Sequence, residues 1–210
     1  MSKYESFYEL LHGAESIPHK AHLVENFSGD QIDPRWTQTN IQGTGTFAIT
    51  DAIDEGASII TGSTLNDKSE IDFNNIRQYD PANSIFISSA KKVTSTTMFI
   101  NVGFTAVIDN SVDHRSFVEH DTDDTFVQLT TEDGSVNSLE STVSIDENWH
   151  LYKIELNNSN NILHIDNVLE VTKTTNLPTT RMQPFFNVAT RASATKEGRI
   201  RYMEWYNKWQ

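Results

Sequence analysis

The sequence predicts an all-β protein, an antiparallel β-sandwich preceded by a short helical arm. From Phe27 onward, short segments rich in β-branched residues alternate with Asn, Asp, Gly and Ser, which is typical of strands and turns. The only persuasive helical pattern ends near residue 12. Many short strands without helices between them favour a sandwich or a barrel.

The arm begins the chain. Tyr4, Phe7, Leu10 and Leu11 recur at helical spacing, and a glycine follows where a helix would stop, so residues 3 to 12 are expected to form an amphipathic helix. A helix of this length is marginal in water. We therefore expect its apolar stripe to dock either on its own domain or on a neighbouring subunit.

The sandwich is expected over residues 26 to 210, and residues 1 to 25 are assigned to the arm. The predicted strands are residues 44 to 50, 57 to 61, 69 to 77, 84 to 93, 96 to 107, 125 to 131, 149 to 157, 161 to 166, 168 to 173, 183 to 191 and 198 to 207.

One hairpin can be predicted in detail. Asp166 and Asn167 stand between the apolar residues Ile165 and Val168. Both turn residues tolerate the positive φ of a tight two-residue turn, so the flanking segments should pair as neighbouring strands.

Composition excludes several classes of partner. The formal net charge is −13, whereas nucleic acid and anionic lipid surfaces require clustered Lys and Arg. The chain contains no Cys, which leaves no disulfide or thiolate metal site. We find no basic and apolar signal segment at the start and no run of roughly 20 apolar residues that would span a membrane.

Three segments carry a family resemblance. The stretch "NWHLYKIELNNSNNILHIDNVLEVT", residues 148 to 172, resembles the concanavalin A-like lectin and glucanase sandwiches, which include laminin-G-like and pentraxin-like domains. Residues 25 to 39 resemble the first strand region of these domains, and residues 198 to 209 resemble their closing strand. Asn167 stands where Gly is usual. The resemblance implies a jelly-roll β-sandwich.

A narrower resemblance concerns virus particles. Residues 172 to 178, "TKTTNLP", and the ending at residues 200 to 206 resemble versions of this sandwich in bacteriophage and other viral structural proteins. This implies a virion protein that lacks enzymatic activity.

A pair of acids raises the question of catalysis. In the predicted strand over residues 69 to 77, Glu70, Asp72 and Asn74 share one face. Laminarinase-type hydrolases of this fold carry Glu-x-Asp-x-Glu, or the same with one more residue at a bulge. The resemblance would make Glu70 the nucleophile and Asp72 its partner, with Asn74 or Asn75 in the acid/base position. An amide cannot transfer that proton, so we predict no enzyme. Glu70, Asp72 and Asn74 then form either a sugar-binding face or an ordinary strand without a ligand.

A second acidic segment is a possible metal site. "VEHDTDDTF", residues 118 to 126, brings together Asp121, Asp123 and Asp124 in an expected loop. Clustered carboxylates can hold Ca²⁺, although the segment lacks the spacing of an EF-hand. A solvated acidic turn is the alternative, and no other cofactor is expected.

These observations lead to a functional hypothesis. We predict a non-enzymatic virion structural or accessory protein, a capsid decoration or tail-associated module, which contacts other virion proteins or copies of itself through its arm. Host glycans are a further candidate partner. The alternative is a microbial carbohydrate-binding or glucanase-like protein, secreted or on the cell surface without a classical signal peptide. An adhesion module that recognises protein is a third reading.

Overall fold

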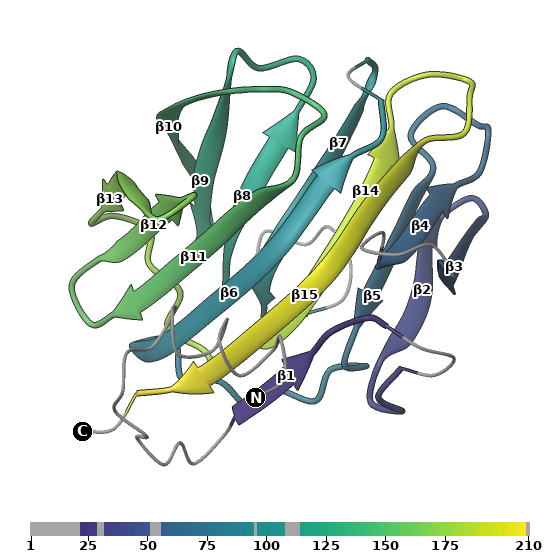
Figure 1. Cartoon of the computed structure of the whole chain (residues 1–210). Helices are drawn as coiled ribbons and strands as arrows, with labels where there is room; N and C mark the ends of the chain where they lie inside the picture. The colour runs from purple at the N-terminus through teal and green to yellow at the C-terminus, as the bar shows by residue number, and fades with distance from the viewer. Residues whose placement is uncertain (1–21, 29–31, 51–55, 95, 108–113, 209–210) are drawn as a thin grey trace, which may run out of the picture.

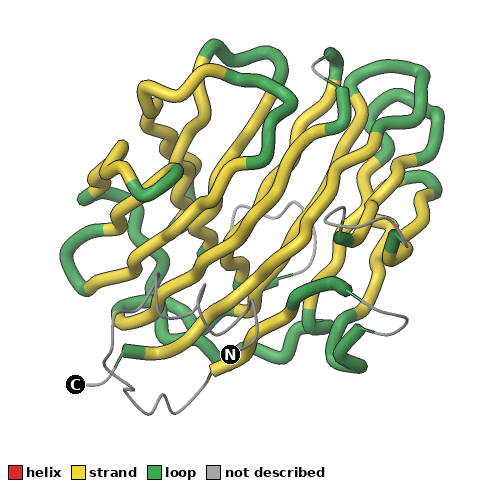
Figure 2. Tube along the Cα trace, viewed as in Figure 1, coloured by secondary structure: helices red, strands yellow, loops and turns green. Residues whose placement is uncertain are grey.

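The computed structural model describes residues 22–28, 32–50, 56–94, 96–107 and 114–208 (Figure 1). Across these residues the chain forms strands and connecting loops and contains no helix (Figure 2). Within the same residues there is no helix of the length and apolarity needed to cross a membrane. The helix predicted over residues 3 to 12 lies outside the described residues.

The strands form two antiparallel sheets, so the predicted antiparallel sandwich is confirmed. Sheet A has the order β13-β12-β11-β6-β15-β4-β3, and β1 pairs with β15 beside this path. Its strands are β1 (His22–Glu25), β3 (Gly45–Ile49), β4 (Ala57–Thr61), β6 (Asn83–Lys92), β11 (His150–Asn157), β12 (Asn161–Ile165), β13 (Val168–Lys173) and β15 (Glu197–Asn207).

Sheet B lies behind sheet A in the view of Figure 1. Its order is β10-β9-β8-β7-β14-β5-β2. The strands are β2 (Thr37–Gln42), β5 (Lys68–Asp72), β7 (Met98–Thr105), β8 (Arg115–Asp121), β9 (Phe126–Glu132), β10 (Val136–Ser144) and β14 (Gln183–Thr190).

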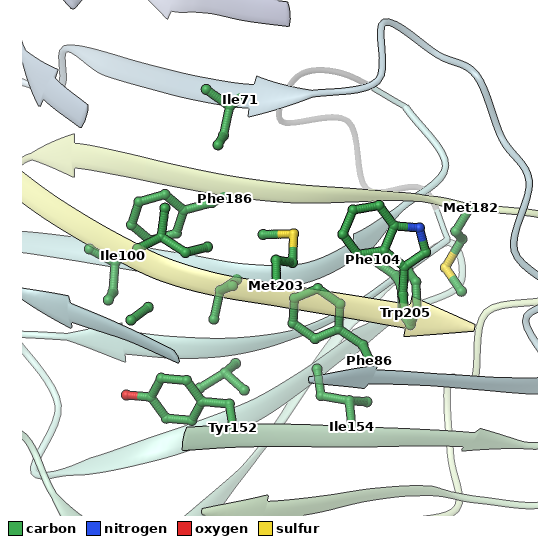
Figure 3. Close-up of a cluster of buried hydrophobic side chains, with 14 of the residues drawn as sticks. Ile71, Phe86, Ile100, Phe104, Tyr152, Ile154, Met182, Phe186, Met203 and Trp205 are labelled. Carbon is green, nitrogen blue, oxygen red and sulfur yellow. The ribbon is translucent and has the colours of Figure 1, made fainter. Parts of the chain in front are cut away.

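The core fills the space between the two sheets (Figure 3). Alternate residues of each strand point into it, as the period of a strand requires. Trp205 of β15 is fully buried and lies at the centre of an aromatic group, with ring centroids 5.7 Å from Trp36, 5.3 Å from Phe73 and 5.8 Å from Tyr79. Edge-on contacts of this kind add to the free energy gained by burying the rings.

The predicted hairpin turn is confirmed. Ile165 pairs with Val168, and Asp166 and Asn167 have φ values of 51° and 69°. Two consecutive positive φ values define the tight turn that matches the twist of antiparallel strands. The Asp166 carboxylate also accepts a hydrogen bond from the backbone N–H of Leu151, which ties the turn to β11.

Several boundaries differ from the sequence predictions. Residues 22–25, assigned to the arm, form β1 and pair with β15, so the sandwich begins earlier than residue 26. Strands β1, β2, β8 and β10 were not predicted, and the strand predicted over residues 69 to 77 ends at Asp72. The segment at 118 to 126 is not a loop throughout, because its first four residues belong to β8.

A second, smaller apolar cluster lies on the face of sheet A that points away from the core. Its members come from three neighbouring strands. We call it the outer cluster, and it consists of Ile85, Ile87, Leu151, Tyr202 and Tyr206.

Candidate functional site

Strand β5 carries the acids that the sequence singled out. Ile71 points into the core and is fully buried, so Glu70 and Asp72 point to the outer face of sheet B. Strand β5 ends at Asp72, and Asn74 and Asn75 follow in a turn with φ values of 49° and 65°.

The turn changes the predicted site. Asn74 is exposed, and its backbone N–H donates a hydrogen bond to the Asp72 carboxylate. The prediction that Asn74 continues the face of Glu70 and Asp72 on one strand is therefore wrong. A left-handed turn, which Asn tolerates well, ends the alternation of side chains on which that prediction depended.

Glu70 belongs to a longer row of polar side chains that crosses sheet B. The strand registers place each member opposite the next on the outer face. We call this set the polar row, and from β2 to β9 it consists of Thr39, Glu70, Asn187, Asn101, Glu119 and Gln128.

The polar row contains buried oxygens without hydrogen-bond donors. Asn187 donates to one Glu70 oxygen at 3.2 Å. The other Glu70 oxygen and the side-chain oxygens of Asn101 and Asn187 are buried, and among the described residues they have no partner. The same holds for one Asp72 oxygen and for the Gln183 amide on the same face. Buried polar atoms normally have partners, so this set marks the face as unusual.

Burial also shifts the pKa of the acids. Loss of hydration raises the pKa of Glu70 to about 7, although the positive charge of Lys68 opposes the shift. Burial raises the pKa of Asp72 to about 6, against the effect of its hydrogen bond from Asn74. Burial likewise raises the pKa of Glu119, in part offset by the hydrogen bond from Thr130.

The raised pKa of Glu70 predicts that the free energy of unfolding falls as the pH rises, and Glu70→Gln should remove this dependence. A carboxyl whose pKa is raised on folding stabilises the native state fully below its unfolded value of 4.5, and this stability is lost as the pH rises through 7. At pH 8 the Gln variant should exceed the wild type in free energy of unfolding by on the order of 2 kcal/mol. Urea unfolding at pH 5 and pH 8 measures the effect. Glu147→Gln, an exposed site, is the control, and equal stability of Glu70→Gln and wild type at pH 8 would contradict the prediction.

Aromatic residues lie on both sides of the polar row. On one side, Phe117 and Phe185 are in contact with a centroid separation of 5.8 Å, and Gly103 lies between them in the register. On the other side, the half-buried Phe99 ring lies near two cations, Lys68 at 5.9 Å and Arg191 at 5.1 Å. The face therefore combines hydrogen-bonding groups with flat apolar surface.

The acidic segment proposed for calcium is occupied by a cation of the chain itself. Arg191 forms an ion pair with Asp121 and approaches Asp123 at 3.3 Å. The backbone N–H of Asp123 donates to the Asp121 carboxylate. In the ranges that the structure describes, no three His, Asp or Glu side chains, Asp124 included, converge to hold a metal ion.

A polar cluster inside the sandwich was not foreseen from the sequence. The backbone N–H of Asp146 donates to Nε2 of His120, so the Nδ1 proton of this ring faces the Tyr152 hydroxyl at 3.2 Å. Burial, together with the nearby charge of Lys92, lowers the pKa of His120 to about 3. Next to it, the two ring nitrogens of His150 contact the Asp146 and Asp166 carboxylates at 3.1 and 2.7 Å. This cluster links β8, β11 and the turn before β13.

The positions of the acids limit the chemistry of the face. Glu70 and Glu119 lie on strands separated by β14 and β7, so three strand spacings of about 4.8 Å place their backbones about 14 Å apart, whereas Glu70 and Asp72 lie two residues apart on one strand, about 7 Å along it. Glycosidases need two carboxyls about 5 to 9.5 Å apart on either side of the bond. The residue in the acid/base position after Asp72 is an exposed amide in a turn.

No family model matches the chain, and no curated protein matches its sequence significantly. Solved structures do match its fold. A β-glucanase of Bacillus licheniformis superposes with a TM-score of 0.65 at 12% identity, covering 89% of this chain and 98% of the other. A pseudo β-1,3-glucanase of Mycobacterium tuberculosis, described as an immunostimulatory antigen, gives a TM-score of 0.65 at 13% identity and the same coverage of both chains.

A carbohydrate recognition domain is similar to the same extent. That of Emp47p superposes with a TM-score of 0.61 at 11% identity, over 94% of this chain and all of the other. At such low identity the likeness establishes the fold alone. The fold is the concanavalin A-like jelly roll of glucanases and lectin-like domains, which confirms the fold expected from the sequence.

Proposed function

We propose that this protein binds carbohydrate on the outer face of sheet B and does not hydrolyse it. The observation that carries the proposal is the polar row, where buried carboxyl and amide oxygens lack donors. The likeness to glucanases, to a pseudo-glucanase and to a carbohydrate recognition domain supports the same class of ligand.

The unpartnered atoms favour a neutral sugar chain. Most of them are acceptors, and sugar hydroxyls are donors that can satisfy acceptors. An acidic glycan would bring its charge toward Glu119 and Asp121 as well as Glu70 and Asp72, in a protein of net charge −13. The half-exposed Phe99 ring offers a flat surface for a sugar ring.

Access determines where the ligand makes contact. Glu70, Asn101 and Asn187 are 3%, 5% and 0% exposed, whereas Glu119 and Gln128 are only half-buried. We therefore expect a sugar to reach the polar row from its β8 and β9 end. A sugar hydroxyl that enters from that end can then donate to the unpartnered oxygens of the row, of which Asn101 is the nearest in the register.

Binding to a soluble β-glucan, measured by titration calorimetry, tests the proposal. Glu119→Ala combined with Gln128→Ala should weaken binding at least tenfold, because two hydrogen-bonding side chains at the accessible end are lost. Glu155→Ala removes an equal charge from β11, in the opposite sheet, and should leave the affinity unchanged. If the wild-type protein bound no neutral glycan in a broad panel, the proposal would be wrong.

Turnover is tested on the same glucans. We expect no release of reducing ends, because the residue in the acid/base position after Asp72 is an amide, which cannot transfer the proton. Hydrolysis that disappears in Glu70→Gln would instead identify an enzyme.

A role in a virus particle stays a prediction. It depends on the resemblance of residues 172 to 178 and 200 to 206 and on the amino-terminal arm. In that setting the protein would contact other virion proteins or copies of itself, and host glycans would be ligands of the polar row. A monomer at all concentrations that never joins a particle would count against this role, and so would a secreted or cell-surface location in a microbe.

A further inference from the structure

The outer cluster is buried although it faces away from the core. Ile87 is 1% exposed, and Ile85, Tyr202 and Tyr206 are 7–9% exposed. Strand β6 is apolar on both faces here, because Phe86 between the two isoleucines points into the core. An antiparallel sheet with one face in water normally carries polar residues on that face.

No described strand covers this cluster. The strands drawn in Figure 1 leave the near face of sheet A without a second described layer in front of it. The five side chains span β11, β6 and β15, which corresponds to two strand spacings or about 10 Å. This width matches the diameter of one helix with its side chains, about 10 Å.

The chain enters sheet A beside the cluster. In β1, His22 pairs with Tyr206, a member of the cluster, so the first described residue of the strand is in register with the cluster. Residues 13 to 21 can extend up to about 30 Å. Residues 3 to 12, which carry the apolar stripe Tyr4, Phe7, Leu10 and Leu11, are therefore within reach of the whole cluster.

We propose that residues 3 to 12 pack through this stripe on the outer cluster of the same chain. A tether of nine residues raises the effective concentration of the segment to the millimolar range, which favours its own chain over a second copy.

Thiol labelling tests this, because the chain has no cysteine of its own. Ile87→Cys places a reporter in the cluster, and Leu151→Cys places a second one at its half-buried rim. Leu169→Cys, at a position 59% exposed on β13, is the control. We expect both cluster thiols to react at least tenfold more slowly than the control in the full chain. Adding Phe7→Asp and Leu10→Asp should speed both of them and leave the control unchanged.

The outcomes separate the possible occupants. Cluster thiols that keep the same rate after the two Asp substitutions would overturn the proposal. Protection that rises with protein concentration, together with a doubled mass in solution, would assign the segment to a second copy and would also overturn it. Protection that is independent of concentration in a monomer is the expected result.

Discussion

Trp205→Ala should lower the free energy of unfolding by about 3 to 5 kcal/mol. Trp205 is fully buried, and its ring contacts Trp36, Phe73 and Tyr79, so alanine leaves a cavity that these rings cannot fill without moving. Urea unfolding followed by circular dichroism measures the loss. A change below about 1 kcal/mol would show that this aromatic group is not the packed centre of the core.

Two further variants sharpen this test. Trp205→Phe should cost less than half as much, because it keeps an aromatic ring and removes an indole N–H that has no acceptor among the described residues. Trp149→Ala deletes the same side chain at a half-buried position near Lys91 and Arg201, and it should be less costly than Trp205→Ala.

Lys92→Met should stabilise the protein by on the order of 3 kcal/mol at pH 7. Lys92 is fully buried at the end of β6, and its ammonium group has no hydrogen-bond partner among the described residues. Burial lowers its pKa to about 8, although Asp121, Asp146 and Glu147 oppose the shift. Methionine keeps the volume and removes the cost of burying the charge.

The stabilisation should depend on pH with a definite sign. The unfolded chain keeps the lysine proton up to about pH 10.5, whereas the folded chain sheds it above about pH 8. Between pH 8 and 10.5, the loss of the Lys92 proton in the folded state therefore raises the free energy of unfolding of the wild type. The advantage of Lys92→Met shrinks over the same range. Urea unfolding at pH 7 and pH 10 checks this, with the half-buried Lys153→Met as control. A Met variant that is less stable than the wild type at pH 7 would contradict the argument.

The sequence predicted those parts of the fold that depend on neighbouring residues. Asp166 and Asn167 favour positive φ, so the β12–β13 hairpin could be placed to the residue. Ile71, between Glu70 and Asp72, is fully buried in the core, as the period of a strand requires. Strand β8 was missed because polar residues occupy both of its faces, with His120 on the core side and Glu119 on the outer side. A period-2 apolar pattern is the signal for a strand, and β8 lacks it.

The candidate site was only partly predictable. The prediction that Glu70 and Asp72 share one face was correct, because it depends on the geometry of one strand alone. The polar row depends on the register of strands far apart in sequence, such as Asn187 opposite Glu70 and Asn101 opposite Glu119. Nothing local specifies those registers. Asn74 is not on this face because a turn begins after Asp72, and the alternation of residues in the sequence does not show where the strand ends.

The place of β15 in sheet A has a consequence for synthesis. This strand pairs with β6 on one side and with β1 and β4 on the other, so the last strand of the sheet pairs with strands made much earlier. During translation, sheet A cannot close until Asn207 has left the ribosome, although the hairpin of β12 and β13 forms from neighbouring residues. Such non-local pairing slows folding. Nascent chains that are still incomplete would therefore expose the apolar faces that the finished sandwich buries.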